Sequence, residues 1–302
     1  MLSDSCGYLV VDHSPSHPRI ILAFRGTYSI ANTIVDLSTI PQEYVPYPGE
    51  DEDETDNRGL PGIIQNPPRI ISRNLESETS KCKNCTVHAG FMRSWRHTRP
   101  HVVPHVEELV ELYPQHQLTL VGHSLGGAVA ALASLEFHAR GWMPQVTTFG
   151  EPRVGNTHLV DYLDRVFPND DQSNRSEMYR RVTHVDDPVP LLPLSEWGYR
   201  MHAGEIYISK SDLTPETKDL EYCIGDADPA CIAGRPTDTT ATDDAKFDIE
   251  LQSLKDWLDM GKGYLTVPAR FRIWQLFFAH RDYFWRLGLC LPYTGTDRNE
   301  EL

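Results

Sequence analysis

The residues best suited to chemistry lie in the stretch Gly122-His123-Ser124-Leu125-Gly126, which has the pattern G-x-S-x-G. An apolar run at 118–121 precedes it, and small helix-forming residues at 128–132 follow it. A serine on a tight strand-to-helix turn is a nucleophile elbow, where the glycines let the backbone turn without steric clash. The pattern alone is common, but its flanks favour Ser124 as a nucleophile.

A serine hydroxyl attacks at neutral pH only if an imidazole takes its proton, and a carboxylate must fix the tautomer of that imidazole. In α/β-hydrolase folds the order along the chain is serine, acid, histidine. His280 lies in an apolar and aromatic setting near the end of the chain, so we expect it to be the base. We expect His202 to be a polar loop residue. The other histidines after the serine fit the geometry or the order less well: His138, His158 and His184.

The acid and the oxyanion donors are expected at strand ends. The apolar run at 179–185 ends at Asp186 and Asp187, one of which should be the triad acid and the other a loop-capping residue. The N–H of Leu125, at the start of a helix, is free to stabilise a developing oxyanion. Thr27 is a candidate second donor, although spacing alone equally fits an ordinary strand-end turn.

The elements that must position these residues alternate between strand and helix. Hydrophobic periodicity and turn residues predict a hairpin (7–12 with 19–24) and a helix (102–113) ended by Pro114. They also predict the strand (118–121) and the helix (128–141) around the elbow, and two further strands (146–149 and 179–185). This order predicts one α/β domain over 1–302, with a mostly parallel central sheet flanked by helices.

Three segments fall outside this alternation. Residues 49–58 are acidic and lack apolar side chains, which indicates a solvated loop rather than a metal site. Residues 210–265 are expected to be a loop-rich excursion that contains a helix at 248–260. The apolar stretch 267–285 is expected to be a buried element that carries His280.

Charge limits the partners of the chain. The net charge is −15, from 28 Lys and Arg against 43 Asp and Glu, which argues against nucleic acid and against attraction to anionic lipid. No run of about 18 apolar residues suggests a transmembrane segment. The sequence therefore predicts a soluble chain with no nucleic-acid partner.

The cysteines point to an oxidising compartment. There are six, and Cys82-x-x-Cys85 lacks the second pair or nearby histidines of a zinc site, so a small disulfide loop is the better interpretation. Sequons at Asn84 and Asn174 agree with a glycosylating environment. We therefore expect the secretory pathway, as a secreted or luminal protein, although no signal peptide is visible in the chain.

Several motifs together resemble the secreted fungal triacylglycerol lipases known as class 3 lipases. Besides the elbow, they are Leu22-Ala23-Phe24-Arg25-Gly26-Thr27, Val87-His88-Ala89-Gly90-Phe91 and Thr148-Phe149-Gly150-Glu151-Pro152-Arg153. The resemblance covers most of 7–210 and the segment around 270–290. It implies that the N-terminal part of the family fold, before Gly7, is missing.

Carried over to this sequence, the resemblance makes Ser124 the nucleophile, Asp187 the acid, His280 the base, and Thr27 with Leu125 the oxyanion hole. It selects Asp187 because the spacing Asp-x-Val-Pro is met by Asp187-Pro188-Val189-Pro190. It supports disulfides Cys82–Cys85 and, less firmly, Cys223–Cys231, and leaves Cys6 as the substitute partner of Cys290. The family needs no cofactor.

In the family, the segment after Thr27 is a lid whose amphipathic helix opens at a lipid surface. Here Ile30, Ile34 and Leu37 would share one apolar helical face within 28–40, as would also suit a core-facing helix. The resemblance thus implies a monomeric triacylglycerol lipase that acts at lipid–water interfaces. The alternatives are a feruloyl-type or short-chain esterase, and a catalytically idle lipase-like protein that binds lipid.

Overall fold

The computed structural model describes residues 6–26, 44–46, 82–168, 178–224, 228–232 and 280–286. For residues 6 and 44–46 only the backbone is described. Several predicted features lie outside the described residues: the lid with Ile30, Ile34 and Leu37, Thr27, the acidic loop 49–58, the sequon at Asn174, the helix 248–260, and the proposed pairing of Cys6 with Cys290.

A seven-stranded sheet forms the centre of the fold, in the order β1-β2-β5-β6-β8-β10-β11. Its strands are β1 (Cys6–Asp12), β2 (Arg19–Arg25), β5 (Gln117–His123), β6 (Gln145–Phe149), β8 (Tyr179–His184), β10 (Glu205–Ile208) and β11 (Leu220–Tyr222). The five inner strands β2, β5, β6, β8 and β10 are parallel, and the edge strands β1 and β11 are antiparallel to their neighbours. The predicted mostly parallel sheet of an α/β fold is confirmed.

Alternating side chains of the inner strands enter the core. On β2, Ile20, Leu22 and Phe24 are buried and their neighbours less so, and Leu118 and Leu120 are buried in the same way on β5. This period of two follows from the pleat of the strand, which sends successive side chains to opposite faces. The predicted hairpin is also present, with Asp12 of β1 paired to Arg19 of β2.

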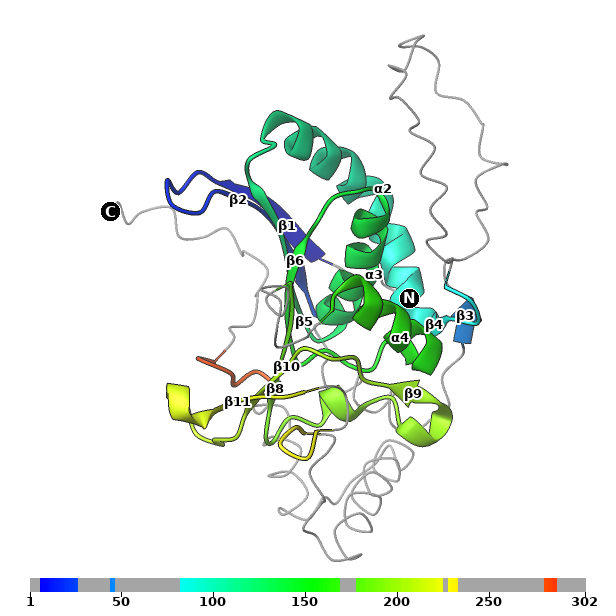
Figure 1. Ribbon diagram of the computed structural model, residues 1–302, viewed down its shortest axis with the longest axis vertical. Coiled ribbons are helices and arrows are strands. Elements are labelled where there is room, and N and C mark those ends of the chain that lie inside the picture. Colours follow the sequence, from blue (N-terminus) through cyan, green and yellow to red (C-terminus); the bar gives the residue numbers. More distant parts are fainter. Residues whose placement is uncertain are drawn as a thin grey trace, which may run out of the picture.

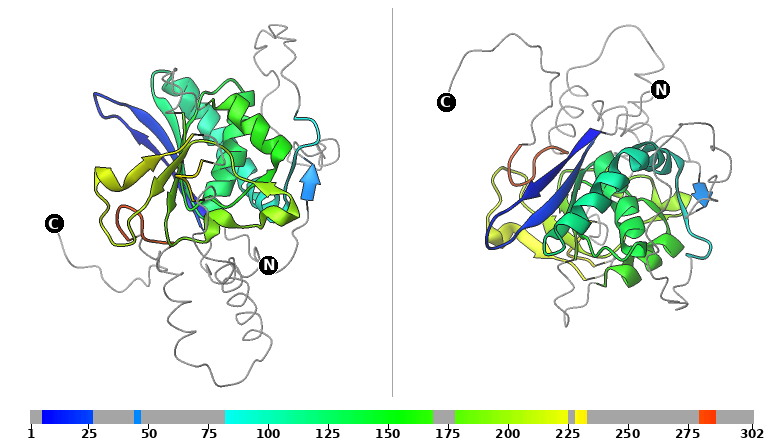
Figure 2. Two further views of the ribbon diagram at one scale, coloured as in Figure 1. Left: turned by 60° about the horizontal axis from the view of Figure 1, so that its bottom comes forward. Right: turned by 90° about the horizontal axis from the view of Figure 1, so that it is seen from above.

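Helices α2 (Ala89–Leu112), α3 (Leu125–Ala139) and α4 (Thr157–Val166) pack on the same side of the sheet (Figures 1 and 2). Helix α3 lies between the sheet and the other two helices, and all its residues from Gly126 to Leu135 are buried. A helix that is apolar on every side must be buried, and small side chains let its neighbours approach closely. The predicted end of this helix near Gly141 is confirmed, since the helix ends at Ala139.

The predicted start of the preceding helix was wrong, because α2 begins at Ala89 and not at residue 102. Two prolines, Pro100 and Pro104, lie inside it and interrupt the apolar pattern that identifies a helix in sequence. Its N-cap is His88, whose Nδ1 accepts hydrogen bonds from the N–H groups of Gly90 (3.1 Å) and Phe91 (3.3 Å). A histidine is an uncommon N-cap, so no usual start signal marked this position.

A small antiparallel sheet accompanies the central one, in the order β3 (Tyr44–Pro46), β4 (Thr86–His88), β7 (Gly155–Asn156) and β9 (Tyr199–Arg200). Short 3-10 turns complete the described structure at Val189–Leu191, Ser195–Trp197 and Thr217–Asp219. Disulfides join Cys82 to Cys85, just before β4, and Cys223 to Cys231, just after β11. Both pairings are those that the resemblance implied.

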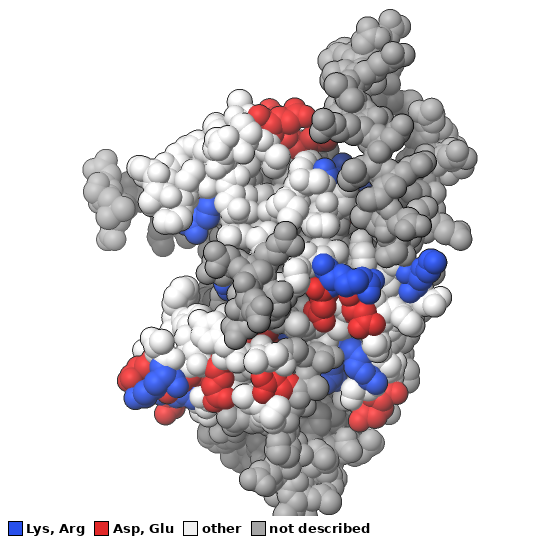
Figure 3. Space-filling model, viewed as in Figure 1, with Lys and Arg blue, Asp and Glu red and all other residues white. Residues whose placement is uncertain are grey.

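The surface carries charges of both signs. On the face shown in Figure 3, acidic and basic side chains lie next to one another, and no broad basic area is seen among the described residues. None of the helices in the described ranges combines the length and the apolar character that crossing a bilayer requires.

Candidate active site

The candidate residues meet where parallel strands of the central sheet end. Ser124 follows β5, Gly150 follows β6, and Asp187 lies shortly after β8. The segment 280–286, orange-red in Figure 1, lies beside β8 and β10, where Tyr283 packs against Val182 and Ile208. The carboxyl ends of neighbouring parallel strands meet at one edge of a sheet, which is where α/β folds bind their ligands.

Ser124 lies on a strained turn between β5 and α3. Its backbone angles are φ 57° and ψ −128°, a region that non-glycine residues seldom adopt. The turn requires glycines on both sides, since a Cβ on Gly122 would lie 2.2 Å from the carbonyl oxygen of Gly126, and one on Gly126 would lie 2.3 Å from that of Phe24. The local geometry is that of a nucleophile elbow.

His280 and Asp187 form a buried pair. Nδ1 of His280 lies 2.9 Å from Oδ1 and 2.8 Å from Oδ2 of Asp187, and both side chains are completely buried. The same carboxylate accepts hydrogen bonds from the hydroxyl of Tyr283 and from the N–H of Val189 (2.9 Å). A carboxylate only accepts, so Nδ1 carries the proton and Nε2 is left with a lone pair.

The environment of Asp187 keeps it ionised. Burial alone would raise its pKa, but the neighbouring His280 and the hydrogen bonds from His280, Tyr283 and Val189 outweigh burial and lower the pKa. Conversely, burial and the carboxylate beside it raise the pKa of Tyr283, so this hydroxyl remains a donor. The electrostatics therefore fix a negative charge behind the imidazole of His280.

Two polar atoms of the site have no hydrogen-bond partner within the part of the chain that the structure describes. They are Oγ of Ser124 and Nε2 of His280, both buried. The ring of His280 lies against the elbow, with its centroid 4.6 Å from that of His123, the residue before Ser124. A hydroxyl and an unprotonated imidazole nitrogen are the donor and acceptor that general-base catalysis brings together.

The two expected oxyanion donors differ in how far the structure describes them. Leu125 is the first residue of α3, where a backbone N–H has no partner within the helix. Thr27 itself is outside the described residues, but its neighbour Gly26 lies against the elbow, since a Cβ there would be 2.8 Å from Cβ of Ser124. The end of β2 thus approaches Ser124.

The other candidates for the acid and the base differ in burial or in their partners. Asp186 is exposed, whereas Asp187 is buried. His202 lies in a loop, as predicted, and it is buried there, with Nε2 3.0 Å from Oε1 of Glu151. The ring of His138 packs against the ring of Phe167, with the two centroids 6.0 Å apart.

Sequence reasoning did not single out three residues that contact the candidate triad: His123, Gly150 and Tyr283. Gly150 has φ +58°, and a Cβ on it would come within 3 Å of atoms of Tyr283, His280 and Asp187. His123 lies in the elbow motif, Gly150 lies in the motif 148–153, and Tyr283 follows the candidate base by three residues. Their contacts, however, depend on segments that only the fold brings together.

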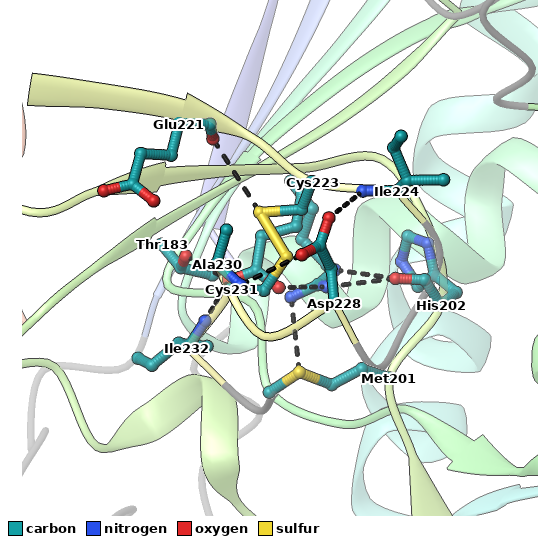
Figure 4. The surroundings of a disulfide bond; sticks show 12 residues. Thr183, Met201, His202, Glu221, Cys223, Ile224, Asp228, Ala230, Cys231 and Ile232 are labelled. Carbon is teal, nitrogen blue, oxygen red and sulfur yellow. Dashed lines mark hydrogen bonds and ion pairs between the residues drawn. A yellow bond between two sulfur atoms is a disulfide. The ribbon is translucent and has the colours of Figure 1, made fainter. Parts of the chain in front are cut away.

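One group of side chains in the described ranges has the composition of a metal site, Glu205 with Cys223 and Cys231. These ligands are engaged elsewhere. The two sulfurs form the disulfide shown in Figure 4, and Glu205 pairs with Arg181, with Nη2 to Oε2 at 3.1 Å. The arrangement is that of a structural cross-link over a buried ion pair.

A cavity of about 730 Å³ lies between β1, β2 and α2. Its walls are apolar on the strand side, at Leu9, Leu22 and Phe24, and polar on the helix side, at Arg96 and His97 among others. Neither Ser124, Asp187 nor His280 lines it, so it is separate from the candidate active site.

Known proteins resemble this chain closely. The family described as lipase (class 3) matches residues 21–197. Secreted mono- and diacylglycerol lipase 2 of Gibberella zeae is 52% identical over 97% of this chain and 70% of its own length, and lipase A of Sodiomyces alcalophilus is 49% identical over 97% and 71%. The crystal structure of Lip2 lipase from Yarrowia lipolytica has a TM-score of 0.66 at 26% identity, covering 96% of this chain and 78% of the other.

Proposed function

The chain belongs to the class 3 lipase family and is therefore a carboxylic-ester hydrolase, and we propose that it hydrolyses triacylglycerols at lipid–water interfaces through Ser124, His280 and Asp187. It is a secreted protein, in agreement with relatives named as secreted and with the two disulfides. We further propose that it acts as a monomer with the segment 28–40 as its lid.

In the proposed mechanism, Nε2 of His280 takes the proton of the Ser124 hydroxyl as Oγ attacks the ester carbonyl carbon. The carbonyl π electrons move to its oxygen, which the N–H groups of Leu125 and Thr27 stabilise. Collapse of this intermediate breaks the bond to the glycerol oxygen, which takes the proton from His280 and leaves an acyl-enzyme. Water then attacks the acyl carbon while His280 takes one of its protons. The bond from the acyl carbon to Oγ of Ser124 breaks, the fatty acid leaves, and His280 returns the proton to Oγ.

Asp187 supports both steps without transferring a proton. It holds His280 in the tautomer with Nδ1 protonated, and its negative charge stabilises the imidazolium that forms in each transition state. Its low pKa and its hydrogen bonds from Tyr283 and Val189 keep it charged and in place. The buried pair of His280 and Asp187 beside a strained serine elbow is the observation that carries this proposal.

The names of the relatives favour a second candidate substrate. One of the most similar proteins is named a mono- and diacylglycerol lipase, as is a Penicillium cyclopium protein that is 31% identical over 74% of this chain. Partial acylglycerols present the same ester to Ser124 but are more polar and leave a different alcohol. The acceptance of one, two or three acyl chains depends on the space around the elbow.

Hydrolysis rates decide between these substrates and the esterase alternatives. We expect hydrolysis of tributyrin to rise steeply once its concentration passes the solubility limit, because the lid would open at the emulsion surface. Hydrolysis rates of long-chain mono-, di- and triacylglycerols, measured at equal interfacial area with Ser124→Ala as the blank, would show which glyceride is preferred. Saturation on soluble esters, with no rise at the emulsion and no long-chain hydrolysis, would contradict the lipase proposal in favour of a feruloyl-type or short-chain esterase.

A further inference from the structure

We propose that His123, the residue before the nucleophile, is a positioning residue that fixes the backbone of His280 relative to Ser124. The inference rests on the proposed roles of Ser124 and His280. It assigns a task to a side chain that belongs to the elbow and contacts the base.

The contact that carries the inference is a hydrogen bond between two distant segments. Nε2 of His123 lies 2.7 Å from the backbone carbonyl oxygen of His280, a residue 157 positions further along the chain. Because a carbonyl oxygen only accepts, Nε2 of His123 must carry a proton and donate it. Strand β5, which positions the nucleophile, is thereby joined directly to the backbone that carries the base.

The rings of the two histidines are also packed together. Their centroids are 4.6 Å apart with an angle of 37° between the planes, and the ring of Tyr283 lies edge-on to His123 at 6.1 Å. His123 therefore restrains His280 twice, through the hydrogen bond to its backbone and through the surface of its imidazole. The pair with Asp187 restrains the same ring from the Nδ1 side.

The charge state of His123 suits this position. Burial, followed by the nearby charge of His280, lowers the pKa of His123 to about 3, so its ring is uncharged near neutral pH. A neutral neighbour does not repel the imidazolium that forms on His280 during catalysis. The two histidines thus divide the roles, since one accepts protons and the other only donates a fixed hydrogen bond.

The separation of Ser124 from His280 matters because proton transfer needs heavy atoms about 2.6–3.2 Å apart. A displacement of about 1 Å can lower a rate about 100-fold. The loss of the tether should therefore reduce the rate of attack by Ser124 and affect substrate binding little.

The test compares variants that separate the ring from the donor. His123→Phe keeps a flat ring and removes the donor, whereas His123→Gln keeps a neutral donor. We expect His123→Phe to lower kcat on a soluble ester about 10- to 100-fold, with KM little changed, and to slow inactivation by a fluorophosphonate by the same factor. His123→Gln should recover most of both rates, and His158→Phe, a substitution at an exposed histidine of α4, should match the wild type.

Each outcome decides between the claims. A folded His123→Phe protein with wild-type kcat and labelling rate would overturn this inference and leave the proposed function intact. A wild-type protein that fails to react would instead overturn the proposed function. If His123→Phe does not fold, His123→Asn and His123→Leu provide a pair of similar volume with and without a donor: faster labelling of the Asn variant supports the tether, and equal rates per folded molecule refute it.

Discussion

The carboxylate of Asp187 is the most constrained group of the site. It accepts hydrogen bonds from an imidazole, a phenol and a backbone N–H, and it has no exposure to solvent. A buried charge without partners would be costly, so this number of donors explains how the fold tolerates it. Asp186 precedes it directly but is exposed, and therefore lacks the low-dielectric setting in which a charge acts strongly on His280.

Gly150 offers a test of how closely the triad is packed. A Cβ there would lie 2.6 Å from the Tyr283 hydroxyl and 2.8 Å from Cε1 of His280, and its φ of +58° also disfavours a side chain. We expect Gly150→Ala to lower kcat at least about 10-fold by displacing these groups. The measurement is kcat on a soluble ester, normalised to the folded fraction.

Gly141→Ala is the matched control for this change. Gly141 also has a positive φ, +84°, but nothing lies within 4 Å of the Cβ that would be added. It should cost about 1–2 kcal/mol of stability through backbone strain and leave kcat unchanged. Equal kcat values for the two variants would show that the triad does not depend on Gly150.

Residue types and their order along the chain supplied most of the candidates for this site. A serine elbow, a pair of aspartates and a late histidine could be selected from the sequence, and the structure brings Asp187 and His280 together across 93 residues. His123, Gly150 and Tyr283 could not be selected. Their contacts to the triad arise from the packing of four separate segments, which no local spacing encodes.

At the scale of elements, predictability followed the strength of local signals. Helix α3 begins with a run of small apolar residues after a glycine-rich turn and ends shortly before Gly141, so its position was evident. Helix α2 contains two prolines and begins at a histidine, so neither its start nor its length was evident. Tertiary packing overrides these weak signals, since Phe91, Met92 and Trp95 of its first turns are buried in the core.

The histidine cap of α2 should make stability depend on pH. Burial, with a contribution from the charge of Arg93, lowers the pKa of His88 to about 4 from its ordinary value of 6.5. Between these values the unfolded chain binds a proton that the folded protein excludes, so stability falls as pH decreases from about 6.5 to about 4. The loss from this residue could reach about 3 kcal/mol.

Substitution of His88 isolates that contribution. Asn is a good N-cap that does not titrate, so His88→Asn should keep the helix start at pH 7 and flatten the dependence of the unfolding free energy on pH between 6.5 and 4. His88→Ala should lose about 1 kcal/mol at pH 7, because the cap is lost. An unchanged pH slope in His88→Asn, measured by urea unfolding, would mean that other groups control acid stability.

At the scale of the whole molecule, the site is a product of topology. The elbow and the proposed acid and base come from the ends of β5 and β8 and from the segment 280–286. The order of the parallel strands places them at one edge of the sheet. The fold class could be predicted because strand and helix alternate along the chain. The pairing of particular strands could not, because neighbouring strands such as β2 and β5 are separated by a long stretch of sequence.

The surroundings of the disulfide Cys223–Cys231 could not be predicted from the sequence either. Ile232, beside Cys231, donates its N–H to Oε1 of Glu205 (3.2 Å), and Thr183 of β8 donates to the same oxygen at 2.5 Å. Asp228 closes the loop by accepting from the N–H groups of Ile224 and Ala230 (Figure 4). The cysteine pair was suggested by resemblance, whereas its link to a buried carboxylate and to the strand before Asp187 emerges only in three dimensions.

The most direct test of the catalytic assignment is the rate and position of labelling by a fluorophosphonate, followed by intact-mass and peptide mass spectrometry. The triad predicts one adduct per chain, on Ser124, that is absent in Ser124→Ala and forms at least about 1,000-fold more slowly in folded His280→Ala and Asp187→Asn. An adduct on another residue, or labelling of Ser124 that is unaffected by the loss of His280, would contradict it.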